Sequence, residues 1–89
     1  MAVRKRVRAH GRVQGVFFRD TVRRAAEEAG VAGWATNRAD GTVEAVFEGD
    51  EEAVERLVRL CRQGPGSAEV DRLDVVDEPP EGLRGFTVR

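Results

Sequence analysis

Residues 11–20 have the sequence Gly-Arg-Val-Gln-Gly-Val-Phe-Phe-Arg-Asp and separate two segments of different periodicity. Before them, residues 3–10 alternate between mostly apolar and basic side chains, which is typical of a strand with one buried face. After them, apolar residues recur at the spacing of an amphipathic helix: Phe18, Val22, Ala25, Ala26 and Ala29. The stretch therefore predicts a strand, a tight turn and a helix that ends at Gly30.

The turn itself favours the binding of an anion. Gly11 and Gly15 let the backbone turn tightly and direct several N–H groups into one concavity. A helix that begins just after the turn points its free N–H groups and its positive dipole end at the same place. Arg19 adds a planar cation suited to phosphate or carboxylate oxygens. On these residues alone, an ordinary β–α turn with a solvated arginine stays an open alternative.

Composition predicts one soluble domain that spans residues 1–89, because the chain is long enough for only a modest core. No apolar run reaches membrane-spanning length, so we expect no membrane partner. Cys61 is the single cysteine and has no partner for an internal disulfide, which favours a reducing, cytoplasmic compartment. With one cysteine and one histidine, a usual zinc site is not expected, and we predict neither a metal nor a cofactor.

The charge is distributed unevenly along the chain. Residues 1–24 hold eight Lys or Arg and one acid, whereas residues 25–89 hold seven Lys or Arg and fifteen acids. The basic end is the end that contains the predicted anion-binding turn. Its field should attract a small anion or a nucleic acid.

The middle of the chain predicts a hairpin followed by a second helix. Residues 31–48 contain two β-rich runs around an Asp-Gly turn signal, and Gly49 is expected to end the second run. Asp50 is a suitable N-cap for a helix that stops at Gly64, which precedes a proline.

Residues 70–76 and 86–88 complete the chain as two further strands. The order is β-α-β-β-α-β with a short extra C-terminal strand, which predicts an α+β, ferredoxin-like two-layer sandwich. In that arrangement the first strand and the first strand of the hairpin need not be neighbours, which leaves room for side chains beside the turn.

Few polar residues outside the turn suggest chemistry. Asn37 ends the first hairpin strand, where its amide could orient a water molecule, although on position alone an asparagine that supports the turn is the commoner use. His10 alternates with arginines and has no evident partner, so we interpret it as a bystander. The aromatic residues are expected to be core rather than ligand platforms: Phe17, Phe18, Trp34 and Phe47.

Two motifs resemble those of the acylphosphatase family. The first is Gly11-x-Val13-Gln14-Gly15-Val16-x-Phe18-Arg19, and the second is Gly33-Trp34-x-x-Asn37 followed by Asp40-Gly41-x-Val43. The resemblance covers nearly the whole chain and implies a monomer that hydrolyses the carboxyl–phosphate bond of a small acyl phosphate. It implies that Arg19 binds the substrate and that Asn37 positions the attacking water. It also implies that backbone N–H groups hold the phosphate: those of Gln14, Gly15, Val16, Phe17 and Phe18.

Two alternatives remain beside this reading. One is a module that binds RNA or another polyanion; because residues 3–10 expose arginines and no aromatics, we expect no specific nucleic-acid partner. The other is a stand-alone relative of the acylphosphatase-like domain that begins larger carbamoyl-transferring maturation proteins. No pocket for the acyl group is evident in the sequence, so the identity of the acyl phosphate is left open.

Overall fold

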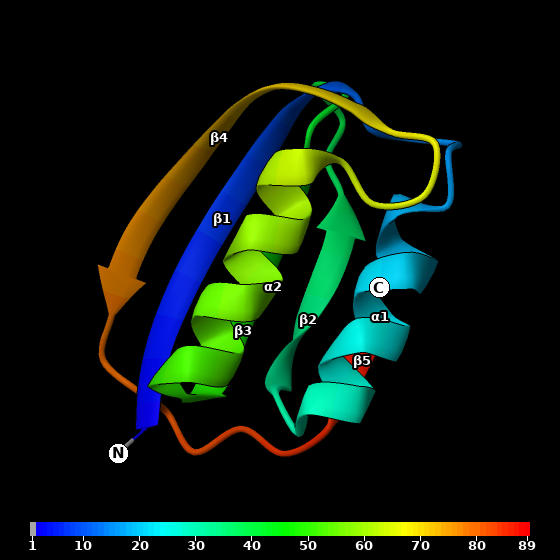
Figure 1. Ribbon diagram of the computed structural model, residues 1–89. Helices are drawn as coiled ribbons and strands as arrows, with labels where there is room; N and C mark the ends of the chain where they lie inside the picture. Colours follow the sequence, from blue (N-terminus) through cyan, green and yellow to red (C-terminus); the bar gives the residue numbers. More distant parts are fainter. Residues whose placement is uncertain (1) are drawn as a thin grey trace.

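The computed structural model describes residues 2–89 as a five-stranded sheet with two helices on one of its faces (Figure 1). This confirms the predicted α+β, ferredoxin-like sandwich and its extra strand. The elements in chain order are β1 (Ala2–Arg12), α1 (Phe18–Ala29), β2 (Ala32–Asn37), β3 (Val43–Asp50), α2 (Glu51–Gln63), β4 (Glu69–Glu78) and β5 (Phe86–Val88).

The strand order β4-β1-β3-β2-β5 brings three strand ends to one edge of the sheet. Both β1 and β2 pair antiparallel with β3, and β5 pairs parallel with β2. Strands β1, β2 and β5 therefore run in the same direction, and their C-terminal ends share an edge. Ala9 and Asn37 both pair with Val43, so Asn37 lies level with Ala9 in the last part of β1.

The core lies between the sheet and the helices. One face of each helix packs on the alternating apolar side chains of the strands, which removes their surface from water. Phe47 stacks on Phe86 with ring centroids 5.8 Å apart, and Phe18 is also buried, as predicted. Cys61 is fully buried, and this burial raises the pKa of its thiol to about 12, as expected for an inert core cysteine.

Three of the predicted boundaries were wrong. Strand β1 continues to Arg12, with a register shift at Gly11. A Cβ at Gly11 would lie 2.3 Å from the carbonyl oxygen of Glu69, so this glycine allows close approach of β4 rather than forming the turn. Gly49 does not end the hairpin but pairs with Val3 inside β3. Strand β4 is longer than the alternation of residues 70–76 indicated.

A buried carboxylate fixes the segment that leads into β5. Glu48 accepts hydrogen bonds from the N–H groups of Glu81, Gly82 and Leu83 at 2.9, 2.7 and 2.9 Å. It also accepts one from the guanidinium of Arg4 at 3.3 Å. Four donors compensate the cost of burying this charge, and they hold the chain where β5 can join the sheet.

Candidate active site

A cleft of about 350 Å³ lies at the edge where the three strands end. It is lined by Val13, Gly15, Phe17, Phe18, Arg19, Asp20, Arg23, Asn37 and Val88. Five of the seven predicted site residues are in this set, and the other two, Gln14 and Val16, hold the loop in place. The fold thus brings both predicted motifs to one cavity.

The loop of residues 13–17 presents unpaired backbone donors at this cleft. Gly15 has φ 72° and Phe17 has φ 64°, while the residue between them does not have a positive φ. Alternating left- and right-handed residues turn successive N–H groups toward one point. In the part of the chain that the structure describes, the N–H groups of residues 15–19 donate to no carbonyl or side chain. They lie where α1 begins, so the helix dipole adds to their positive potential.

Phe17 is 75% exposed, and its predicted place in the core was wrong. The residue has the left-handed conformation at the N-cap of α1, which is strained for a bulky side chain. That conformation turns the ring outward, whereas Phe18 on the next position points into the core. Sequence periodicity could not reveal this, because the alternation of side-chain direction is broken at the turn.

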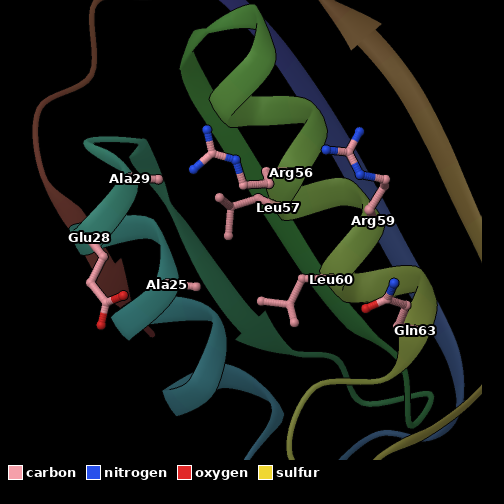
Figure 2. Close-up of a pocket in the computed structure, with 8 residues that line it drawn as sticks. All are labelled: Ala25, Glu28, Ala29, Arg56, Leu57, Arg59, Leu60 and Gln63. Atoms are coloured by element: carbon pink, nitrogen blue, oxygen red, sulfur yellow. The ribbon is translucent and has the colours of Figure 1, made fainter.

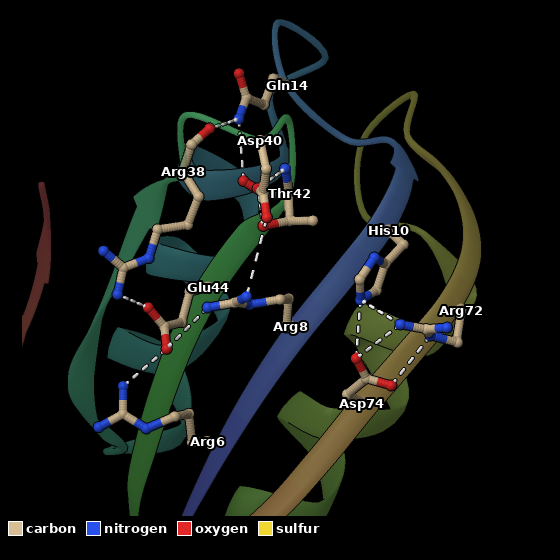
Figure 3. A network of polar contacts seen from close by, with 10 residues as sticks. All are labelled: Arg6, Arg8, His10, Gln14, Arg38, Asp40, Thr42, Glu44, Arg72 and Asp74. Atoms are coloured by element: carbon tan, nitrogen blue, oxygen red, sulfur yellow. Dashed lines mark hydrogen bonds and ion pairs between the residues drawn. The ribbon is translucent and has the colours of Figure 1, made fainter.

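Two contacts fix the loop from opposite sides. The side-chain amide of Gln14 donates from Nε2 to the carbonyl oxygens of Arg38 and Thr42 at 2.8 and 3.0 Å (Figure 3). The carbonyl of Val16 accepts from the N–H and the hydroxyl of Ser67 at 3.3 and 3.4 Å. In Figure 1 the loop accordingly lies beside the yellow segment that follows α2. These carbonyl contacts leave the N–H groups of the loop free.

Arg19 is on the first turn of α1 and reaches across the cleft. Its Nη1 donates to the main-chain carbonyl oxygen of Arg89 at 2.8 Å. No Asp or Glu side chain in the described part of the chain pairs with Arg19, so its guanidinium can bind an anion beside the free N–H groups of the loop.

Asn37, the last residue of β2, also lines the cleft. Its Oδ1 is buried and accepts no hydrogen bond from any described residue. A buried acceptor without a donor is costly, which indicates that the site is completed by a further molecule. The alternative role, support of the hairpin turn, is taken by Asp40, whose Oδ1 accepts from the N–H and hydroxyl of Thr42 at 3.0 and 2.6 Å.

Asp20 and Arg23 also line the cleft and were not predicted from the sequence. Arg23 follows Arg19 by four residues on the same helical face, a spacing that could have identified it. Arg23 donates to Asp20 at 2.7 Å. This bond, together with the nearby charge of Arg24, lowers the pKa of Asp20 below its usual value, so Asp20 is a weak base.

His10 does not contribute to the cleft. It lies on the face of the sheet that has no helices, where its Nε2 is 2.8 Å from an oxygen of Asp74 and 3.2 Å from Arg72 (Figure 3). The same face carries Arg6, whose Nη1 donates to Glu44 at 2.9 Å. This face is therefore a network of ion pairs rather than a reactive site.

A larger groove, of about 480 Å³, runs between the two helices, away from the free N–H donors (Figure 2). It exists because Ala25 and Ala29 of α1 are too small to fill the space opposite Leu57 and Leu60 of α2. Its charged groups lie along the rim and do not converge, so we take the smaller cleft as the candidate active site. No cluster of three or more His, Cys, Asp or Glu able to hold a metal ion is present among residues 2–89.

Comparison with known proteins gives a consistent result. The family model for acylphosphatase matches residues 5–88, which is nearly the whole chain. The chain belongs to the acylphosphatase family. It is 57% identical over 88 residues to an acylphosphatase of Rubrobacter xylanophilus, covering 96% of this chain and 80% of that protein. It is 56% identical over 87 residues to one of Gloeobacter violaceus, covering 98% of this chain and 94% of that protein.

The structure of an acylphosphatase from Coxiella burnetii has the same fold as this family member. It superposes with a TM-score of 0.93 at 35% sequence identity, over 99% of this chain and 93% of that one. The predicted family resemblance is thereby confirmed, and the chain is an enzyme of the acylphosphatase type. None of the helices between residues 2 and 89 is long and apolar enough to span a membrane.

Proposed function

We propose that this chain is a single catalytic domain that hydrolyses the carboxyl–phosphate bond of acyl phosphates without a metal or cofactor. The observation that carries the proposal is the meeting, in one cleft, of free backbone N–H groups, the cation of Arg19 and the unsatisfied Oδ1 of Asn37. Together these groups can hold a phosphoryl group and a water molecule. Family membership supports the same activity.

In this proposal the phosphoryl oxygens bind to the N–H groups of residues 14–18 and to Arg19. Such fixed donors stabilise the charge of the equatorial oxygens in the transition state and need no reorganisation during the reaction. The planar guanidinium can contact two oxygens at once, which a lysine could not do. The hydrogen bond to the carbonyl of Arg89 keeps the guanidinium oriented before substrate arrives.

Asn37 is proposed to hold the attacking water. Its Oδ1 would accept one hydrogen of the water, and this contact would also satisfy an acceptor that is otherwise buried without a donor. An amide can position water without removing its proton, because it has no basicity at neutral pH. The water oxygen is thereby placed near phosphorus with the correct orientation.

The chemical step is a direct displacement at phosphorus. The water oxygen forms a bond to phosphorus while the bond from phosphorus to the acyl oxygen breaks, and that electron pair leaves with the carboxylate. One proton of the water passes to a phosphoryl oxygen of the substrate, so the products are a carboxylate and inorganic phosphate. No strong general acid is needed, because a carboxylate is a weakly basic leaving group. Asp20 is a poor proton acceptor because Arg23 lowers its pKa.

The compartment, the oligomeric state and the partners are also proposals. The only cysteine is buried and unpaired, which supports a reducing cytoplasm. We propose that the chain acts as a monomer, because one chain supplies all the groups that the proposed reaction uses: the free N–H groups of the loop, Arg19 and Asn37. We further propose that it has no specific nucleic-acid partner, because the face without helices pairs its arginines with acids and covers Trp34 with Arg6 and Arg89.

The test is the hydrolysis of benzoyl phosphate by the purified protein in excess EDTA, beside a folded Arg19→Gln variant. We expect rapid turnover that the chelator does not affect and that the variant loses. No turnover by a folded wild-type protein would contradict the enzymatic proposal. Salt-sensitive binding of RNA without hydrolysis would instead favour the polyanion-binding alternative.

A further inference from the structure

Two exposed apolar side chains flank the cleft. Phe17 is 75% exposed and Val88 is 40% exposed, and both belong to the lining that contains Arg19 and Asn37. Val76 is comparably exposed, at 55%, but it lies on β4 outside the cleft. Because large apolar side chains are usually buried, two that converge on one cavity from opposite ends of the chain indicate an apolar ligand group.

The position of Phe17 is maintained at a cost to the backbone. A phenylalanine with φ 64° is strained, and a glycine would relieve that strain while keeping the same turn. The chain instead has a large ring here, directed outward at the entrance of the cleft. Such an outlier supports a functional role for the ring itself, in addition to the role of the backbone N–H.

The two ends of a bound acyl phosphate would lie at different depths in the cleft. The Oδ1 of Asn37 is buried, whereas Phe17 and Val88 lie at the exposed rim. In a direct displacement the water and the leaving group lie on opposite sides of phosphorus. If water is held at the buried end, the acyl group must extend toward the rim, where it meets the two apolar side chains.

The charges at the cleft favour an uncharged acyl group. Two arginines line it, and Arg19 is used for the phosphoryl group. The second, Arg23, already pairs with Asp20 at 2.7 Å and with Glu27 at 3.3 Å. A second anionic group on the substrate would therefore find the carboxylate of Asp20 and no unpaired arginine among the residues that line the cleft.

We propose that Phe17 and Val88 form the subsite for the acyl group and select acyl phosphates whose acyl part is apolar and uncharged, such as aryl or branched alkyl. This inference rests on the proposed function and specifies its substrate class. An aromatic acyl group can stack on the Phe17 ring and contact the Val88 methyl groups as it departs. Acyl phosphates that carry a second anionic group are disfavoured.

The test compares kcat/KM for benzoyl phosphate with kcat/KM for acetyl phosphate in wild type and variants. The two substrates differ in intrinsic reactivity, but this difference contributes the same factor to the ratio in every protein. A change of the ratio between wild type and a variant therefore reports only on the enzyme. Phe17→Asn keeps the N–H group and tolerates the left-handed backbone, and it should lower the benzoyl-to-acetyl ratio about tenfold. Val88→Thr keeps the shape of the side chain and should lower the ratio about threefold. The matched control Val76→Thr, on β4, should leave the ratio unchanged.

A second pair of substrates tests the charge argument. Butyryl and succinyl phosphate have the same chain length, but only the latter carries an extra carboxylate. We expect wild type to prefer butyryl phosphate at least about fivefold, and we expect Asp20→Asn to narrow that preference. The subsite would be contradicted by an unchanged benzoyl-to-acetyl ratio in both Phe17→Asn and Val88→Thr. Equal kcat/KM of wild type for butyryl and succinyl phosphate would also contradict it. Neither result would contradict the proposed hydrolase activity. Failure of folded wild type to hydrolyse any of the four would overturn the proposed function itself.

Discussion

The guanidinium of Arg19 and the main-chain carbonyl of Arg89 are joined by a hydrogen bond of 2.8 Å, which links the first turn of α1 to the residue after β5. Arg89 is itself fixed, because its N–H donates to the carbonyl of Ala35 at 2.8 Å and its guanidinium lies 4.5 Å from the ring centroid of Trp34. The orientation of Arg19 therefore depends on a backbone atom rather than on a side chain.

The first prediction follows from that dependence. A chain that stops at Val88 loses the carbonyl partner of Arg19, and we expect kcat/KM for benzoyl phosphate to fall about ten- to a hundredfold because the guanidinium is no longer positioned. Arg89→Ala keeps the carbonyl and loses only the contact with Trp34, so its activity should stay within about twofold of wild type. Its stability should fall by about 0.5–1 kcal/mol. Steady-state kinetics measure the activity of the two variants, and urea denaturation measures their stability. Equal losses of kcat/KM in the two variants would contradict the prediction.

Asn37 should affect activity far more than stability. Because its Oδ1 accepts no hydrogen bond in the described part of the chain, Asn37→Ala removes little from the folded state, and we expect less than about 1 kcal/mol of destabilisation. We expect kcat to fall about 10²- to 10³-fold with KM little changed, as for a group that acts in the transition state. Thr36→Val, on the neighbouring position of β2, is the control and should keep wild-type kinetics. A large loss of stability in Asn37→Ala would instead assign the residue a structural role.

The element order was predictable because local signals agree along the chain. The alternation of β1, the apolar spacing of α1 and the turn signal of the hairpin each specify their own segment without reference to the rest of the fold. Arg19 and Asn37 were joined in one site through the family resemblance of their motifs, and the structure brings both residues to the same cleft. The sequence also supplied the family resemblance that the comparison confirmed.

The features that could not be predicted depend on contacts between distant segments. Gly11 was assigned to the turn because its close approach to Glu69 of β4 has no local signature. Val88 reaches the cleft only because β5 pairs parallel with β2, a pairing that a three-residue strand does not specify. Phe17 was placed in the core because the left-handed backbone that exposes it is invisible to periodicity.

Glu48 should make the stability of the fold sensitive to acid. Burial alone would raise the pKa of its carboxyl, but three N–H donors and Arg4 outweigh that effect and lower the pKa below the usual value. A depressed pKa in the folded state adds stability above the unfolded pKa of about 4.3, and this contribution is lost as the pH falls through the folded pKa. The free energy of unfolding should therefore decrease as the pH drops below about 4.

The matched variants for this prediction are Glu48→Gln and Glu52→Gln. Removal of the charge at Glu48 should cost about 1–3 kcal/mol at pH 7, because Arg4 and three N–H groups lose a charged acceptor, and this difference should shrink toward zero by about pH 2. Glu52 is exposed on α2, so its variant should follow the wild-type curve. Urea midpoints measured from pH 7 to pH 2 provide the comparison. If the urea midpoints of wild type and Glu48→Gln fall in parallel as the pH is lowered, the carboxylate of Glu48 is not the cause of the loss of stability in acid.

Gly66 should control the loop of residues 13–17 from outside the cleft. It has φ 66°, and a Cβ there would lie 2.7 Å from the carbonyl oxygen of Val16, so Gly66→Ala must displace the loop whose N–H groups are proposed to bind phosphate. Gly30 has a similar φ of 70° with no atom within 4 Å of an added Cβ, which makes Gly30→Ala the matched control. Both variants should lose about 1 kcal/mol of stability from backbone strain. Only Gly66→Ala should weaken competitive inhibition by inorganic phosphate, by about tenfold, because the free donors then no longer converge on one point.

Inhibition constants for phosphate measure the effect on the loop, and urea denaturation measures the effect on stability. Unaltered phosphate inhibition in Gly66→Ala would show that the loop does not need this packing to bind the anion.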